Sequence, residues 1–119
     1  MYKRNYIVLI TAFLLVSCGP PKTLYTWGGK KYAYSKTSYK YLKASNEETS
    51  ERLTKTYEKI INDQKGTRKV PPPGILADYG FLLLQQNKTE EGKQMLMKEI
   101  ELYPESEIFI TRILKMIGE

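Results

Sequence analysis

The sequence contains no histidine and a single cysteine, Cys18, among its 119 residues. Histidine and cysteine are the usual ligands of transition metals, so the common zinc, copper and iron sites are excluded. Histidine is also missing as a general acid or base. A lone cysteine cannot close a disulfide within the chain, so Cys18 requires another explanation. We expect no metal and no cofactor.

Motifs that support catalysis are also lacking. No serine lies in a Gly-x-Ser-x-Gly elbow, and there is no glycine-rich phosphate-binding loop. Most carboxylates fall at expected helix starts or on polar faces, where capping and the helix dipole account for them. Asp78 and Glu99 are exceptions, but neither has a convincing carboxylate partner. We therefore expect no catalytic residues, no enzymatic activity and no small-molecule substrate.

The charge is unevenly distributed along the chain. The net charge is +6, and the segment from Cys18 to Asn46 has six lysines and no acidic residue. From Glu47 to the end there are 11 basic and 13 acidic residues. The basic character therefore belongs to the N-terminal part, ahead of a slightly acidic region. The length indicates one small domain.

Residues 1–17 have the arrangement of a secretory signal peptide. Two basic residues precede an apolar run from Tyr6 to Val16. That run is too short to cross a bilayer as a mature helix, which needs about 20 apolar residues. It ends at Leu15-Val16-Ser17-Cys18. An ordinary signal peptide followed by a stray cysteine is the alternative interpretation.

Leu-Val-Ser-Cys resembles the lipobox of bacterial lipoproteins. The resemblance implies cleavage between Ser17 and Cys18, a thioether lipid on Cys18 and acylation of the new amino terminus. Several acyl chains on one residue anchor a protein stably. Gly19 stands where an aspartate commonly favours retention in the inner membrane. By the same resemblance, we expect an outer-membrane protein that faces the periplasm.

Residues 18–31 are predicted to form an extended, lipid-anchored tether, because proline and glycine pairs interrupt it. Tyr25, Trp27, Lys30 and Lys31 combine aromatic and basic side chains, which suits docking of a partner or contact with anionic lipid. Alternatively, Trp27 folds back onto the helical core. Nucleic-acid proteins interleave such residues too, but a compartment outside the cytosol argues against that partner.

Residues 32–119 predict an all-α domain of about five helices, because apolar residues recur at intervals of three and four. Pro71-Pro72-Pro73 predicts a stiff entry to a helix, or else a polyproline docking segment. The first helix is expected from about residue 32, and the others over about 45–63, 74–86, 89–104 and 105–117.

Capping and apolar spacing add detail to these helices. Ser45 is expected to cap the second helix, with Glu48 in the capping-box position, and Thr89 to cap the fourth. The third helix is expected to bury Leu76, Tyr79, Leu82 and Leu83, and the last helix to bury Phe109, Ile113, Met116 and Ile117.

Residues 74–104 resemble one tetratricopeptide repeat, which is a helix pair of about 34 residues. Leu76 and Glu99 depart from the pattern. A weaker copy precedes it, so we expect a short helical-repeat bundle. The matching positions are Tyr79-Gly80, Leu83, Gly92 at the helix crossing, Leu96 and Leu102-Tyr103-Pro104.

The whole mature chain resembles a family of small uncharacterised bacterial lipoproteins with tetratricopeptide-like helices. The resemblance implies a genetic association with two other lipoprotein types, one similar to the curli secretion channel. It rests on Leu24-Tyr25-Thr26-Trp27-Gly28, Tyr39-Lys40-Tyr41-Leu42, Val70-Pro71-Pro72-Pro73-Gly74, Ala77-Asp78-Tyr79-Gly80 and Leu102-Tyr103-Pro104-Glu105-Ser106.

Two functions follow as hypotheses. The first is a membrane-anchored interaction scaffold, or an accessory subunit of a secretion or assembly complex in the cell envelope, with other envelope lipoproteins as partners. Its binding face is either Trp27 with its neighbours or a groove around Tyr79 and Leu83, although plain core packing also explains those two residues. The second is a membrane-surface element that binds anionic lipid through its basic, aromatic tether.

Overall fold

The computed structural model describes residues 19–20 and 22–118. Over these ranges the chain forms five α-helices, one short 3₁₀-helix and no strand, which confirms the predicted all-α bundle. The predicted signal peptide, the cleavage after Ser17 and the lipid on Cys18 lie outside the described residues.

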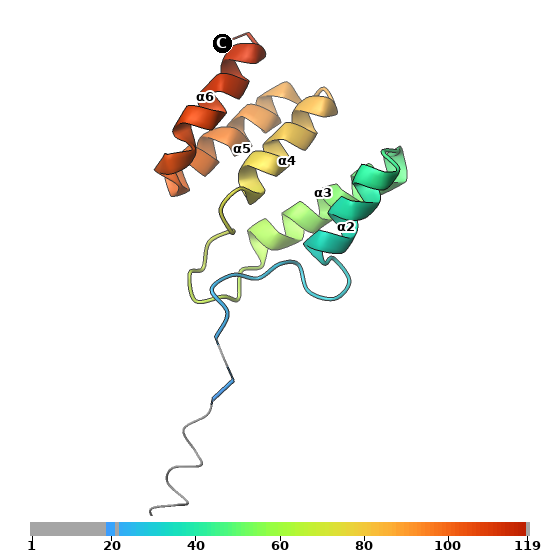
Figure 1. Ribbon diagram of the computed structural model, residues 1–119, viewed down its shortest axis with the longest axis vertical. Helices are drawn as coiled ribbons and strands as arrows, with labels where there is room; N and C mark the ends of the chain where they lie inside the picture. Colours follow the sequence, from blue (N-terminus) through green and yellow to red (C-terminus); the bar gives the residue numbers. More distant parts are fainter. Residues whose placement is uncertain (1–18, 21, 119) are drawn as a thin grey trace, which may run out of the picture.

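The helices form two antiparallel pairs and a closing helix (Figure 1). The closing helix packs against α5 and the 3₁₀-helix. The chain enters at one end of the bundle and terminates at the opposite end (Figure 1). The elements are α2 (Tyr34–Lys43), α3 (Glu47–Asn62), α4 (Ile75–Gln85), α5 (Thr89–Leu102), the 3₁₀-helix η1 (Pro104–Ser106) and α6 (Glu107–Met116).

Helix α4 is the centre of the bundle, because side chains around most of its circumference are buried. One face joins α3 in a cluster that contains Leu53, Tyr57 and Ile60. Another face joins α5 and α6, where Leu96 and Ile110 are completely buried. The four residues of this helix that were predicted to face inward, Leu76, Tyr79, Leu82 and Leu83, are all buried.

Gly80 and Gly92 let α4 and α5 touch backbone to backbone. A Cβ atom added to Gly80 would lie 2.8 Å from the carbonyl oxygen of Gly92, and the reverse distance is also 2.8 Å. Packed carbon and oxygen atoms do not tolerate so short a separation, so any side chain here would push the helices apart. The prediction that Gly92 stands at the helix crossing is confirmed.

Both predicted N-caps are wrong. Helix α3 is capped by Asn46, whose Oδ1 accepts from the Thr49 backbone N–H at 2.9 Å, while the Asn46 N–H donates to Thr49 Oγ1 at 3.1 Å. Asparagine caps a helix as well as serine does, so Asn46 can replace Ser45 in this role. Because the helix then starts one residue later than predicted, Thr49 takes the capping-box position that was expected for Glu48. In α5, Thr89 is the first helical residue and Lys88 precedes it without a side-chain cap.

Helix α6 is rotated from its predicted orientation. Ile110 is its completely buried residue, whereas Phe109 is 62% exposed and Met116 is 83% exposed. Ile110 fits beside Leu96 in the cluster between α4 and α5. The apolar face of this helix is wide, because Phe109, Ile110, Ile113, Leu114 and Met116 all lie on it, so the spacing did not identify which of them is buried.

The proline-rich loop ahead of α4 is held by the end of α5. The Gly74 N–H donates to the buried Glu99 carboxylate at 2.6 Å, and the Tyr103 hydroxyl donates to the Pro71 carbonyl at 2.6 Å. Pro71 and Pro72 are buried, which fits a stiff entry to α4. Glu99, an exception to the repeat pattern, thus places a carboxylate at the positive end of α4.

We expect the substitutions Gly80→Ala and Gly92→Ala each to lower the free energy of unfolding by about 1–3 kcal/mol, because overpacking at a helix contact is destabilising. Chemical denaturation followed by circular dichroism measures the change. Gly19→Ala is the control, since nothing lies within 4 Å of a Cβ there and its φ is not positive. Equal stability of all three variants and the parent would contradict the role given to the crossing.

Candidate functional site

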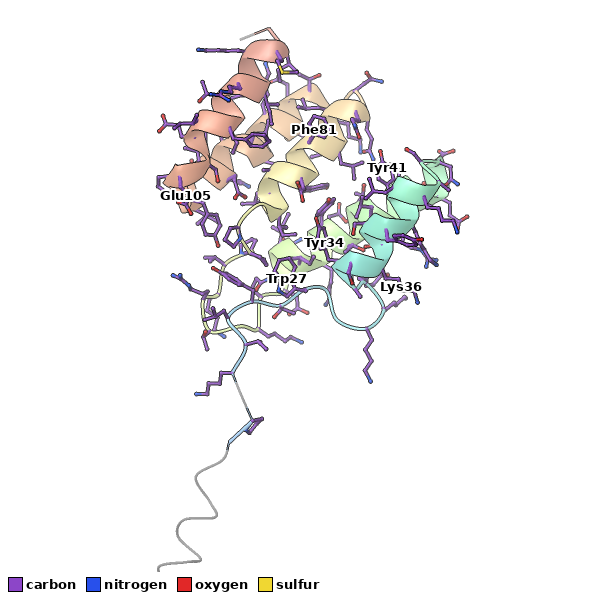
Figure 2. All side chains as sticks on the ribbon, viewed as in Figure 1. Trp27, Tyr34, Lys36, Tyr41, Phe81 and Glu105 are labelled. Carbon is purple, nitrogen blue, oxygen red and sulfur yellow. The ribbon has the colours of Figure 1, made fainter. Side chains whose placement is uncertain are left out.

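A largely apolar groove lies between α2, α4 and α6, with α3 beneath it. Its volume is about 550 Å³. Figure 2 shows Tyr34 and Tyr41 on α2 and Phe81 on α4, which are three of the lining residues. The lining consists of Tyr34, Ser38, Tyr41, Leu42, Leu53, Tyr57, Ala77, Asp78, Phe81, Leu82, Gln85, Phe109, Ile113 and Met116.

Four large apolar side chains of this groove are exposed. They are Leu42 at 81%, Phe81 at 48%, Phe109 at 62% and Met116 at 83%. They come from three helices and meet in one concave surface, unlike the singly scattered apolar residues of an ordinary protein surface. Apolar patches of this kind mark binding sites. We refer to this surface as the apolar groove.

One charged residue, Asp78, lines the apolar groove. Its Oδ2 accepts a hydrogen bond from the Tyr34 hydroxyl at 2.8 Å. Nearby, the Tyr41 hydroxyl donates to Gln85 Oε1 at 3.1 Å. Both bonds join α2 to α4 across the groove, so the first helix pair is tied to the second by polar contacts at the surface. The exposed charge in the groove is negative.

A row of aromatic rings runs under the groove and out to the N-terminal segment. The ring centroids of Trp27 and Tyr34 are 5.8 Å apart, those of Tyr34 and Tyr57 are 5.9 Å apart, and those of Tyr57 and Tyr79 are 5.5 Å apart. These separations are typical of favourable aromatic pairs. The row ties the N-terminal segment, α2, α3 and α4 into one body.

Burial makes the tyrosine hydroxyls of this row harder to ionise. Burial raises the pKa of Tyr34 to about 12, and the hydrogen bond to Asp78 is the second cause. Burial likewise raises the pKa of Tyr79 to about 12, with the Glu58 carboxylate adding to the effect. Burial also raises the pKa of Tyr57, which lies between them. The folded chain therefore holds these phenols in their neutral form.

The four residues predicted to bind a partner do not line the apolar groove. Trp27 is 47% exposed and lies beside Tyr34 (Figure 2). Tyr25 is half-buried, and its hydroxyl lies close enough to help burial raise the pKa of Tyr103. Lys30 and Lys31 are exposed, and the Lys31 ammonium lies 5.3 Å from the Tyr32 ring.

Tyr79 and Leu83, the residues of the alternative groove, are both buried in the core cluster that joins α3 and α4. The actual groove uses the next face of α4, which carries Ala77, Phe81 and Gln85. The sequence signal that was available is α6 itself: it has more apolar residues than one buried face can hold. The surplus, Phe109 and Met116, lines the groove.

The predicted tether is not extended along its whole length. The Thr67 N–H donates to the Thr23 carbonyl at 3.0 Å, and the Arg68 N–H donates to the Leu24 carbonyl at 3.2 Å. Gln64 bonds to both backbone groups of Thr26, at 2.8 and 2.9 Å. Residues 23–27 thus pack on the loop that follows α3, because hydrogen bonding to that loop satisfies their backbone groups.

Gly66 permits this contact. A Cβ atom at Gly66 would lie 2.2 Å from the Leu24 carbonyl oxygen and 2.7 Å from the Tyr25 Cα. Only a residue without a side chain lets the two segments approach so closely.

Within residues 19–20 and 22–118, no group of three or more His, Cys, Asp or Glu residues is arranged to hold a metal ion. None of the helices in this part of the chain has the length and apolar character needed to cross a bilayer.

A comparison with protein-family models matches residues 24–113 to a family described as a domain of unknown function, DUF4810. No curated protein and no solved structure matches the chain significantly.

The raised tyrosine pKa values predict a loss of stability at high pH. An unfolded chain ionises its phenols near pH 10, whereas Tyr34 and Tyr79 ionise near pH 12 when folded. Their contribution to the free energy of unfolding is therefore complete below pH 10 and is lost as the pH rises toward 12. Chemical denaturation at a series of pH values measures this loss of stability. The absorbance of the phenolate form follows the ionisation of the tyrosines over the same range.

The double substitution Tyr34→Phe and Tyr79→Phe should reduce this alkaline loss, because it removes two of the phenols. Tyr39→Phe, which removes a 65% exposed phenol, is the control. Complete ionisation of the tyrosines near pH 10 in a chain that remains helical would contradict the prediction.

Proposed function

Since the chain belongs to the DUF4810 family of domains of unknown function, we propose from its own residues that it is a lipid-anchored lipoprotein of the cell envelope. Its helical domain binds a partner protein through the apolar groove. It acts as an interaction scaffold or an accessory subunit in a secretion or assembly complex.

The N-terminal sequence supports the anchor. A basic start, an apolar run and Leu15-Val16-Ser17-Cys18 stand in the order of a lipoprotein signal peptide. Cys18 is the only thiol in the chain, so it is the one nucleophile of this kind that could accept a thioether lipid. By resemblance, Gly19 favours placement in the outer membrane, with the domain in the periplasm.

The observation that carries the scaffold proposal is the gathering of Leu42, Phe81, Phe109 and Met116 in one groove. Removing such apolar surface from water stabilises a complex by about 25 cal/mol for each Å² buried. Hydrophobic grooves between helices commonly receive the apolar face of an amphipathic helix. The occupant we propose is such a helix from a partner protein.

Charge defines the occupant further. Asp78 is the charged residue that lines the groove, and it is exposed. A lysine or arginine on the partner helix, placed beside its apolar residues, would pair with this carboxylate. Other envelope lipoproteins are the proposed partners, including the type similar to the curli secretion channel that the family resemblance implies.

Contact with anionic lipid is the second candidate function. Lys30 and Lys31 are exposed on the same segment as Trp27, whose ring is 47% exposed. Basic and aromatic residues together favour a membrane surface. This contact would accompany the scaffold role, since its residues and those of the groove are different.

The substitution Cys18→Ala should abolish lipidation, because it removes the thiol that carries the lipid. We expect the protein to lack the mass of the acyl chains and its precursor to keep the leader. Intact-mass spectrometry of the membrane-derived protein measures both. A parent chain that carries no acyl mass would refute the anchor, whereas the groove would remain to be tested separately.

The double substitution Phe81→Ala and Phe109→Ala should remove most of the partner captured from gently solubilised membranes, because it deletes the apolar contact. Asp78→Asn should weaken capture less, since it removes one ion pair at a wet surface. Quantitative mass spectrometry of material co-purified through a C-terminal tag measures both effects.

The matched control is Met97→Ala with Ile108→Ala. These residues are 49% and 71% exposed and do not line the groove. A photo-crosslinking residue at position 81 identifies the partner segment, which should be amphipathic and carry a basic residue. Equal loss of capture in the control, or a crosslinked segment without apolar residues, would refute the proposal.

A further inference from the structure

Two loops that are far apart in sequence meet at the end of the molecule where the chain enters. Residues 22–32 and residues 63–69 lie side by side there (Figure 1). Their contact is formed by the hydrogen bonds of Thr23 and Leu24 with Thr67 and Arg68, and by the close approach at Gly66. We call the surface of these two loops the anchor-end surface.

The net positive charge of the described residues is concentrated on this surface. Its six cations are all exposed, and its one carboxylate, Asp63, is paired with Lys59 and lies 3.6 Å from Lys65. Six positive charges and one negative charge leave a net +5. The remaining residues, 33–62 and 70–118, carry 11 basic and 11 acidic side chains and are neutral. The cations are Lys22, Lys30, Lys31, Lys65, Arg68 and Lys69.

The sequence places this surface close to the proposed lipid anchor. Five residue steps separate Cys18 from Thr23, the first residue that bonds to the second loop, so their Cα atoms are at most about 17 Å apart. Electrostatic attraction to a charged surface persists over about 8–10 Å in physiological salt. The short connection therefore brings the cations within reach of lipid headgroups.

Apolar side chains accompany the cations. Leu24 is 58% exposed and Trp27 is 47% exposed, and both belong to the first loop. Tryptophan favours the boundary between headgroups and water. A basic surface that includes such residues suits a bilayer better than it suits an acidic protein, because the proposed anchor holds the bilayer permanently beside it.

We propose that the anchor-end surface contacts anionic phospholipid headgroups in the leaflet that holds the Cys18 lipid. This inference rests on the anchoring proposed above and adds Lys65, Arg68 and Lys69 to the contact. The acyl chains already retain the protein in the membrane, so the contact sets its orientation. The C-terminal end of α6 then points away from the bilayer (Figure 1).

The test uses the lipidated protein in nanodiscs of phosphatidylcholine, with and without phosphatidylglycerol, that contain a nitroxide-quencher headgroup lipid. A fluorophore is attached through Thr67→Cys on the second loop, or through Arg112→Cys on α6. With phosphatidylglycerol, we expect strong quenching at position 67, weak quenching at position 112, and loss of the difference in high salt.

Charge reversal gives the matched comparison. The triple variant Lys65→Glu, Arg68→Glu and Lys69→Glu should lose most of the quenching at position 67 while it stays in the nanodisc. The control triple variant Lys88→Glu, Lys98→Glu and Lys115→Glu changes the net charge equally, with exposed residues of other elements, and should keep that quenching.

Equal quenching at the two positions, equal quenching in the two lipid mixtures, or equal loss in the control triple variant would overturn the proposal. Failure of the anchor itself is seen separately, as an intact mass without acyl chains. In that event, the same comparison on vesicles of the two compositions still decides whether the anchor-end surface contacts anionic lipid.

Discussion

The backbone contact between Gly80 and Gly92 is the constraint on which the rest of the bundle depends. With no Cβ atom at either position, α4 and α5 approach until backbone atoms meet, and Leu96 closes over the crossing. Ile110 of α6 then fills the space beside Leu96. With Ile110 buried there, its neighbour Phe109 faces the groove. The close contact between α4 and α5 therefore determines both the core and the candidate binding surface.

Much of this architecture could be predicted from periodicity and from the prolines and glycines between helices. The helix boundaries agree within a few residues, and α4 buries its four expected side chains. The caps were less predictable, because Ser45 and Asn46 are neighbours of nearly equal capping strength. The orientation of α6 was wrong because Phe109 and Ile110 are both large and apolar, so that packing alone selects the buried one.

The candidate surfaces were harder to predict because each combines distant segments. The lysines near Trp27 were visible in the sequence, but their meeting with Arg68 depends on irregular backbone pairing, which leaves no periodic signal. The apolar groove likewise needs α2, α4 and α6 in their final places. Asp78 could be recognised as unexplained, but its place in that groove, where it accepts a hydrogen bond from Tyr34, depends on how α2 and α4 pack.

The aromatic row also gives the protein a built-in optical reporter. The chain has ten tyrosines and one tryptophan, and Trp27 stands at the outer end of rings spaced 5.5–5.9 Å apart. When a buried tyrosine absorbs ultraviolet light, its excitation energy is transferred efficiently to a tryptophan at such separations. The ultraviolet emission of the unmodified protein therefore comes mainly from one indole, and its wavelength follows the polarity of the surroundings of that ring.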